Sequence, residues 1–450
     1  MPYRLMDSNA SRTAKFDELA IVYSEYYKGK IQTIPKVPVR HLSDFSVWYT
    51  PGVAAVSLKI AKEIDLSFEM TGKWNNVAII TDGTRVLGIG NVGPEASLPV
   101  MEGKALIFNF LGGVNAMPVP IRVHSKDEFI ATAKALEPSF GGFNLEDIES
   151  PKCFFILEEL QKSLSIPAWH DDQLGTACIS LAGLFNGLKL TNRKIEEAKI
   201  VLMGSGAANI ATAFLLIAAG AKPGNILMTD SHGILEPERS DMDKLMLNNP
   251  WKYQLAIKTN SERLKGPEEY AFKGADVVIA ASKPGPGTIK PEWIRSMNTD
   301  AIVFALANPN PEIWPDDAIA SGAKIVATGR SDFSNQVNNS LVFPGVFRGI
   351  LDARSKGVNF DVMVSASKEI ANFVKDPSPD KIVPSMDEWG LYPTVASAVA
   401  RKTVELGLAR KIDSREGFRK TASEIIEANR KLYLKLLDDK LIKDLPGGGK

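Results

Sequence analysis

Two pairs of adjacent acidic residues each follow an apolar or glycine-rich run in this sequence. Asp171-Asp172 follow the run at 166–169, and Glu146-Asp147 follow the segment at 141–145. Carboxylates at the C-terminal edge of an α/β sheet lie where such folds bind ligands, and carboxylate oxygens suit a divalent cation. Helix N-capping is the simpler alternative. Capping explains one carboxylate per helix better than two at each position, so the pattern favours a metal site.

Three further residues have functional groups that fit such a site, although each also has an ordinary interpretation. Tyr49 is in a Thr-Pro-Gly turn, where an aromatic ring commonly serves as a packing anchor. Lys104 lies in a segment with helical spacing, where a lysine is usually a solvated charge. Arg85 lies in a glycine-rich loop after the predicted strand 77–81. Its planar guanidinium is able to hold a carboxylate there, but a surface arginine is the commoner case.

Residues 199–230 have the order of a dinucleotide-binding unit: a strand at 199–203, a glycine turn, a helix to 219, a strand at 226–229, and then Asp230. The glycines allow the helix N-terminus to reach a pyrophosphate, and the acid suits ribose hydroxyls. Asn209 replaces the third glycine, which raises the question of how tightly helix and strand pack. Asp230 favours NAD because it repels a 2′-phosphate, whereas Ser231-His232 provide groups that accept one.

The remaining patterns predict an α/β fold with a mainly parallel sheet. Predicted strands lie at 77–81, 119–123, 277–280, 302–307 and 324–328, and helices at 11–29, 97–110, 126–136, 177–187, 361–374, 394–408 and 414–438. A chain of 450 residues exceeds what one core usually supports. We expect an N-terminal α/β substrate and catalytic domain (1–165), a Rossmann-type NAD(P)-binding domain (166–375), and a C-terminal helical segment (376–450) that packs on the N-terminal domain.

Composition excludes several partner classes. Lys plus Arg and Asp plus Glu both total 53, which gives no electrostatic reason to expect nucleic acid or an anionic membrane. Two cysteines make no disulfide framework and are typical of a reducing compartment. The sequence shows neither a signal peptide nor an apolar run long enough to span a bilayer. We therefore expect a cytoplasmic protein.

Seven motifs in order resemble those of the malic enzymes, in their short prokaryotic form. They lie at 49–54, 81–88, 101–105, 144–147, 170–173, 304–309, and 338–339 with 343–345. The resemblance covers roughly residues 30–410 and is far more specific than the glycine turn alone.

The resemblance implies a role for each matching residue. The metal ligands, for Mg²⁺ or Mn²⁺, are Glu146, Asp147 and Asp172. The catalytic residues are Lys104 as general base, Tyr49 as general acid, and Asp171 as the carboxylate beside the lysine. The substrate is held by Arg85, Asn308 and Asn339. The cofactor site, for NAD or NADP, comprises Gly204, Ser205, Gly206, Ala207, Ala208, Asn209, Asp230 and Asn308.

The implied reaction is oxidative decarboxylation of L-malate to pyruvate and CO₂ with reduction of NAD(P). Its chemistry needs a base at the C2 hydroxyl, a hydride acceptor, a cation at the C2 oxygen, and an acid for the enolate. Two alternatives are a malolactic conversion to lactate and a non-catalytic NAD-binding protein. A homodimer is implied by the resemblance alone. The sequence does not decide whether Tyr49 acts within its own subunit or across a dimer interface.

Overall fold

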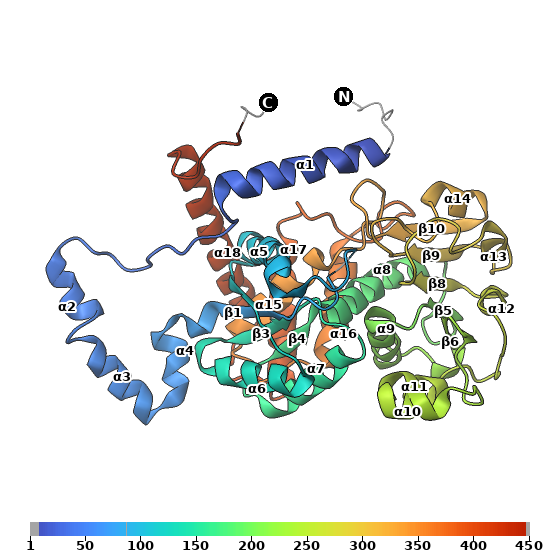
Figure 1. The fold of residues 1–450 in the computed structure, drawn as a ribbon, viewed down its shortest axis with the longest axis horizontal. Helices are drawn as coiled ribbons and strands as arrows, with labels where there is room; N and C mark the ends of the chain where they lie inside the picture. The colour runs from blue at the N-terminus through green and yellow to red at the C-terminus, as the bar shows by residue number, and fades with distance from the viewer. Residues whose placement is uncertain (1–8, 87, 447–450) are drawn as a thin grey trace.

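The computed structural model describes residues 9–86 and 88–446, and its framework is two sheets (Figure 1). The first sheet is parallel, with the order β2-β1-β3-β4. Its strands are β1 (Asn76–Thr81), β2 (Asn115–Pro120), β3 (Gly142–Leu145) and β4 (Ala168–His170). The second sheet has the order β10-β9-β8-β5-β6-β7, and only β7 is antiparallel to its neighbour. Its strands are β5 (Ile200–Met203), β6 (Ile226–Asp230), β7 (Gly233–Ile234), β8 (Val277–Ala280), β9 (Ala301–Ala305) and β10 (Ala323–Thr328).

Helices cover both sheets, as buried parallel sheets require. Those of the first half are α1 (Asn9–Tyr27), α2 (Phe45–Trp48), α3 (Val53–Lys62), α4 (Ser67–Met70), α5 (Gly93–Gly112), α6 (Lys126–Leu136), α7 (Lys152–Ser163), α8 (Thr176–Leu190) and α9 (Ala207–Ala218). Those of the second half are α10 (Met242–Asn248), α11 (Pro250–Lys258), α12 (Glu269–Phe272), α13 (Pro291–Arg295), α14 (Pro315–Ala320), α15 (Phe343–Asp352), α16 (Phe360–Phe373), α17 (Leu391–Glu405) and α18 (Arg415–Asp438). Among the described helices, none combines the length and the apolar character needed to cross a bilayer.

Most predicted elements are confirmed within a few residues, and the clearest error is the strand expected at 119–123. Strand β2 instead runs from Asn115 to Pro120. It is an edge strand that pairs only with β1, so Pro118 and Pro120 cost no ladder hydrogen bond on its open side. The sequence pattern was misleading because the most apolar residues follow Pro120, where the chain is already leaving the sheet.

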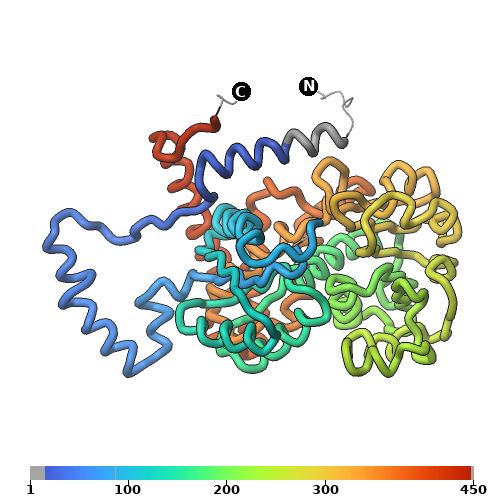
Figure 2. Tube along the Cα trace, in the orientation of Figure 1, coloured from blue at the N-terminus to red at the C-terminus, as the bar shows by residue number. Residues whose placement is uncertain are grey.

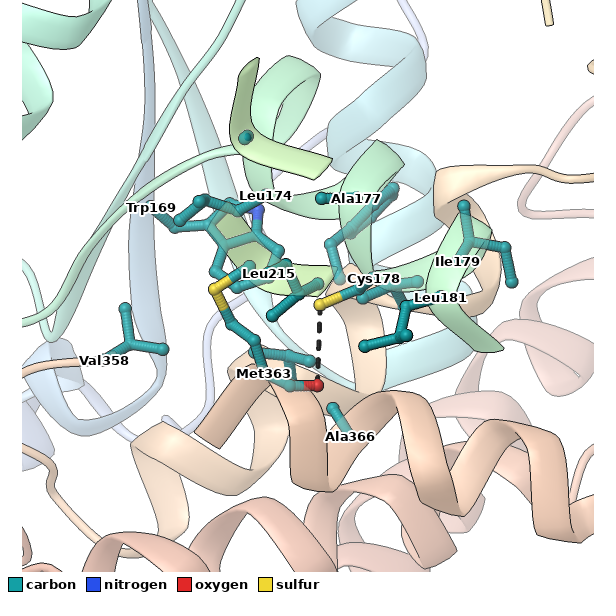
Figure 3. Packing of buried hydrophobic residues seen from close by; sticks show 14 of the residues in the cluster. Trp169, Leu174, Ala177, Cys178, Ile179, Leu181, Leu215, Val358, Met363 and Ala366 are labelled. Atoms are coloured by element: carbon teal, nitrogen blue, oxygen red, sulfur yellow. Dashed lines mark hydrogen bonds between the residues drawn. The ribbon is translucent and has the colours of Figure 1, made fainter. Parts of the chain in front are cut away.

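Helix α8 connects the two sheets, because it follows β4 of the first sheet and precedes β5 of the second. It is buried along most of its length and packs against both α9 and α16, and Figure 3 shows Cys178 of α8 facing Met363 of α16. Cys178 Sγ donates a hydrogen bond of 3.7 Å to the carbonyl oxygen of Met363, and Ser367 Oγ donates one of 2.9 Å to the carbonyl of Cys178. Residues of both sheets belong to one continuous hydrophobic core. The two sheets are therefore fixed relative to each other by packed side chains.

The first sheet extends past the expected boundary at residue 165, because β4 pairs with β3. We therefore propose a first unit that includes β4 and ends near residue 170. The C-terminal helix α18 contacts α5, and Asn429 Nδ2 donates 2.8 Å to the carbonyl oxygen of Asn109. This contact supports the proposed packing of the last segment on the N-terminal unit.

Residues 28–66 form an arm that stands away from both sheets (Figure 2). In its helices α2 and α3 no side chain is buried. The arm exposes large apolar side chains along its length: Ile31, Ile34, Val37, Val39, Leu42, Phe45, Val47, Trp48, Val53, Val56, Leu58 and Ile64. A segment with so much apolar surface and no core of its own is typical of a protein–protein contact.

Candidate active site

The three acidic residues predicted to bind a metal converge at one edge of the first sheet. Glu146 follows β3 and Asp172 follows β4, and these strands are parallel neighbours, so their carboxyl ends meet. Carboxylate oxygens of Glu146, Asp147 and Asp172 lie within 4.8 Å of one another. The backbone N–H of Asp147 donates a 2.9 Å hydrogen bond to Asp172 Oδ2, which joins the two loops. Three clustered carboxylates fit a hard divalent cation.

Lys104 reaches this cluster from helix α5. Its Nζ lies 2.5 Å from Glu146 Oε1 and 2.5 Å from Asp171 Oδ2, and 4.8 Å from the centre of the Phe343 ring. Burial alone would lower the pKa of Lys104, but the carboxylates of Asp171 and Glu146 outweigh it and raise the pKa above the usual value. Burial, offset in part by Lys104, raises the pKa of Glu146 well above its ordinary value. Lys104 is therefore held as an ammonium shared by two carboxylates.

Asp171 is fully buried, and both of its carboxylate oxygens accept hydrogen bonds. Trp169 Nε1 donates 3.1 Å to Oδ1, while Asn339 Nδ2 donates 3.1 Å to Oδ2, the atom that Lys104 also contacts. The aspartate opens a π-helical turn, Asp171–Gly175, that leads into α8. A Cβ atom on Gly175 would lie 2.1 Å from Asp171 Oδ1. The turn therefore needs glycine at that position.

Trp169, Gly175 and Asn144 are site residues that the sequence interpretation missed. Asn144 is buried at the end of β3, and its Nδ2 donates 2.8 Å to Glu146 Oε2. In the sequence, the one feature that marks these residues is that they lie near the acidic pairs. Nearness in sequence does not show whether a residue contacts the carboxylates or belongs to the core.

Arg85 lies in the loop after β1, beside the carboxylates. Its backbone N–H donates 3.0 Å to the carbonyl oxygen of Asp147, and its side chain is exposed. Gly83 lies against Gly93 within this loop. Its φ is +66°, and a Cβ atom at this position would lie 2.2 Å from the carbonyl oxygen of Gly93. The guanidinium is thus tethered near the cluster and free to approach a ligand from solvent.

The glycine turn after β5 places the dinucleotide unit next to this cluster. Gly204 has a φ of +90°, and a Cβ there would lie 2.5 Å from the carbonyl oxygen of Ala281. Gly206 precedes α9, so Ser205, Ala207 and Ala208 border the helix N-terminus. Helix α9 packs against the π-helical turn at 171–175. The helix whose N-terminus would receive a phosphate is therefore in contact with the turn that carries Asp171 and Asp172.

Asn209 does not loosen the contact between helix and strand. Its buried Nδ2 lies 2.8 Å from the carbonyl oxygen of Met203, 3.0 Å from that of Gly204 and 3.2 Å from that of Ile279. The amide thus ties α9 to β5 and β8, where a glycine would only have allowed close approach.

Asn308 and Asp230 lie at strand ends of the second sheet. Asn308 follows β9 and is close to Gly329, which follows β10. Asp230 ends β6, but its carboxylate is engaged by Arg239 and Lys252. Burial would raise the pKa of Asp230, but hydrogen bonds from these two cations lower it.

Tyr49 is the one predicted catalytic residue that the protomer does not bring to the site. It directly follows α2 on the arm, with 70% of its surface exposed. Figure 1 shows α2 far from β3, β4 and α5. One protomer therefore assembles the predicted base and the carboxylates but not the predicted acid.

Comparison with known proteins identifies relatives over most of the chain. The family described as "Malic enzyme, NAD binding domain" matches residues 174–404, and "Malic enzyme, N-terminal domain" matches residues 28–126. The bifunctional malic/malolactic enzyme of Bacillus subtilis is 44% identical over 408 residues, covering 90% of this chain and 97% of that protein. The NAD-dependent malic enzyme of Geobacillus stearothermophilus is 44% identical over 385 residues, covering 85% of this chain and 78% of that protein.

Solved structures agree with these relatives. The malic enzyme of Entamoeba histolytica superposes with a TM-score of 0.94 at 40% identity, covering 99% of this chain and 94% of that one. The malic enzyme of Pyrococcus horikoshii gives a TM-score of 0.89 at 43% identity, covering 93% and 99%. The predicted combination of a substrate domain, a Rossmann-type domain and C-terminal helices is the architecture they share. With matching sequence families, matching folds and a lysine set among converging carboxylates, the chain belongs to the malic enzyme family.

Proposed function

We propose that this protein oxidises L-malate at C2 and decarboxylates the product to pyruvate and CO₂, with NAD(P) as hydride acceptor. The observation that carries the proposal is the position of Lys104. It lies between Asp171 and Glu146, beside a carboxylate cluster, and helix α9, which follows the dinucleotide turn, packs against the π-helical turn that carries Asp171. A base, metal ligands and a hydride acceptor are what this reaction needs in one place.

Glu146, Asp147 and Asp172 are the proposed ligands of Mg²⁺ or Mn²⁺. A cation bound there polarises the C2 oxygen of the substrate and stabilises the enolate left by loss of CO₂. The hydrogen bond from Asn144 to Glu146 and that from the Asp147 backbone to Asp172 hold two of these side chains in place. Outer contacts of this kind commonly orient metal ligands.

Lys104 is the proposed base, and it must release a proton before it can take one from the C2 hydroxyl. Its two carboxylate neighbours oppose that release. With a divalent cation on Glu146, this carboxylate would stabilise the ammonium less, which would favour the neutral amine that a base needs. Asp171, fixed by Trp169 and Asn339, then orients the amine.

Arg85, Asn308 and Asn339 are the proposed substrate contacts. The backbone of Arg85 is fixed on Asp147, so its exposed guanidinium is tethered where a substrate carboxylate chelated by the cation would lie. Asn339 already donates to Asp171, which places its amide within the same cluster.

We further propose a homodimer in which Tyr49 completes the site of the partner. The acid is exposed on an arm with an uncovered apolar surface, while the Lys104 site lacks it. A second copy of the chain that covers the arm would bury its apolar surface and supply a tyrosine to the Lys104 site.

Both cysteines are buried and unbridged, which supports the proposed cytoplasmic location.

The reaction is tested by incubating the protein with L-malate, Mn²⁺ and either NAD or NADP. We expect equal amounts of reduced cofactor and pyruvate. The Bacillus subtilis relative is named as bifunctional, so lactate is measured in the same reaction. Lactate without net cofactor reduction would establish the malolactic alternative, and cofactor binding without malate turnover would establish a non-catalytic protein.

A further inference from the structure

Glu312 is a fully buried carboxylate that joins two loops of the second sheet. Its Oε1 accepts 2.9 Å from the backbone N–H of Ser282 and 3.1 Å from Ser282 Oγ, in the loop after β8. Its Oε2 accepts 3.1 Å from the backbone N–H of Ala307, in the loop after β9. The two loops are therefore held to each other through one side chain.

The donors around Glu312 are all neutral groups. Within the part of the chain that the structure describes, no lysine or arginine pairs with this carboxylate. Burial raises the pKa of Glu312, and hydrogen bonds from Ser282 and Ala307 partly oppose that rise. A buried carboxylate without a cation costs free energy that a well-packed apolar side chain would not. Departures of this kind from stable packing are expected at functional sites.

The loops that this carboxylate joins lie beside the glycine turn of the dinucleotide unit. The chain passes from β5 to β6 on one side and returns to β8 on the other, so the strand order reverses between β5 and β8. Ligands of such sheets bind beside this reversal, at the carboxyl ends of the strands. Ser282 borders the turn, since a Cβ atom on Gly204 would lie 3.1 Å from its Cα. Ala307 directly precedes Asn308, a proposed substrate contact.

We propose that Glu312 is a positioning residue, which fixes the start of its loop so that Asn308 is held toward the substrate and the nicotinamide ring. The inference rests on the proposed function, in which Asn308 contacts the substrate. Strands β8 and β9 lie on the opposite side of β5 from β6, whose end is where dinucleotide folds hold the adenosine ribose. The loops joined by Glu312 therefore face the nicotinamide half of the cofactor.

Glu312→Gln tests the proposal with little change in side-chain size. One accepting oxygen becomes an NH₂ group, which then faces an N–H donor. The KM for malate should rise about tenfold while kcat changes less than about threefold, because a contact equal in the ground and transition states is weakened. In an Asn308→Ala background, Glu312→Gln should change KM less than about twofold, since Glu312 acts through Asn308.

Asp276→Asn is the matched control for a loss of stability alone. Asp276 is a buried carboxylate at the other end of β8, and it accepts 3.0 Å from Arg193 Nε and 2.9 Å from the backbone N–H of Lys199. Both variants should lower Tm, but Asp276→Asn should leave the KM for malate within about twofold of wild type.

The proposal is overturned if Glu312→Gln lowers Tm without changing KM, if Asp276→Asn raises KM as much, or if the effects of Glu312→Gln and Asn308→Ala multiply. Ser282→Ala, which removes a single donor, serves if the glutamine variant does not fold. It should raise the KM for malate about threefold, and an unchanged KM would likewise overturn the proposal.

A binding measurement separates this inference from the assigned reaction. Calorimetry compares NADH with ADP-ribose, which lacks the nicotinamide ring. Glu312→Gln should weaken NADH about tenfold and ADP-ribose less than about twofold. This result in a protein that does not oxidise malate would leave the role of Glu312 standing and refute the reaction. Malate oxidation with KM and both Kd values unchanged in the variant would refute the role of Glu312 alone.

Discussion

Lys104 has two carboxylate neighbours with different proposed tasks. Asp171 is buried, accepts hydrogen bonds from Trp169 and Asn339, and contacts Lys104 through Oδ2, so its proposed task is to orient the lysine. Glu146 belongs both to the lysine pair and to the acidic cluster. In the proposed mechanism, Glu146 therefore links the charge of the acidic cluster to the proton on Lys104.

Replacing Asp172 with Asn tests the metal assignment. The variant removes one anionic ligand of three, so turnover at saturating malate and low Mn²⁺ should fall by about a hundredfold or more. Titration with Mn²⁺ should show weakened binding. Glu149→Gln, at an exposed acid two residues beyond Asp147, is the matched control and should change neither quantity. Near-normal turnover of the Asp172 variant at low Mn²⁺ would refute the ligand set.

Replacing Lys104 with Met tests the proposed base. Loss of a general base typically costs about 10²- to 10⁴-fold in rate, so kcat should fall by that order. Binding of the reduced cofactor, followed by its fluorescence, should be unchanged. Lys162→Met removes an exposed lysine that pairs with Glu158 on α7 and should leave kcat intact. A kcat within about threefold of the wild-type value for the Lys104 variant would show that Lys104 is not the general base.

At the scale of elements, the π-helical turn after β4 positions the site. Asp171 is buried in this turn, and Asp172 accepts a hydrogen bond from the backbone of Asp147 in the loop after β3. The same turn contacts α9, the helix at the dinucleotide turn. One short element thus connects the proposed partner of the base, a proposed metal ligand and the helix that follows the dinucleotide turn.

Gly175→Ala tests this arrangement, because the added Cβ would lie 2.1 Å from Asp171 Oδ1. The aspartate must move, and a displacement of this kind costs about 10²-fold in rate. Overpacking should also lower the free energy of unfolding by about 1–3 kcal/mol, which urea denaturation measures. Gly357→Ala, at a glycine with open space around it, is the control. Unchanged activity in the Gly175 variant would show that the turn tolerates a side chain and does not fix Asp171.

At the scale of the whole molecule, the arm carries the residue that the proposed site would take from a second copy of the chain. The arm has an apolar surface over residues 31–64 but contributes no buried side chain from α2 or α3. Tyr49 lies on it, exposed. The proposed dimer places this tyrosine at the Lys104 site of the other copy.

Mixing two inactive variants tests the exchange. If Tyr49 acts across the interface, a mixed dimer of Tyr49→Phe and Lys104→Met protomers has one intact site, formed by Lys104 of the first and Tyr49 of the second. Refolding an equal mixture should restore about a quarter of wild-type activity, since half the dimers are mixed and one site of two works. Mixing Tyr49→Phe with Tyr49→Ala is the control and should restore none. No recovery in the first mixture would mean that Tyr49 acts within its own subunit.

Local patterns in the sequence determined the fold class, the strands β1, β5, β6, β8, β9 and β10, and the position of each acidic pair at a strand end. They did so because strand and helix periodicity, glycine turns and acidic residues after a strand are features of neighbouring residues. They also marked Lys104 and Arg85 as candidates, without showing what either contacts.

Tertiary structure alone decided which of these groups meet. Pairing of β3 with β4 brings Glu146 to Asp172, and packing of α5 brings Lys104 to Asp171, 67 residues along the chain. Asp230 is paired with cations 9 and 22 residues away, and Tyr49 is exposed on the arm. Such contacts depend on how separate elements pack. No spacing within a single stretch of sequence encodes the charge that surrounds a carboxylate.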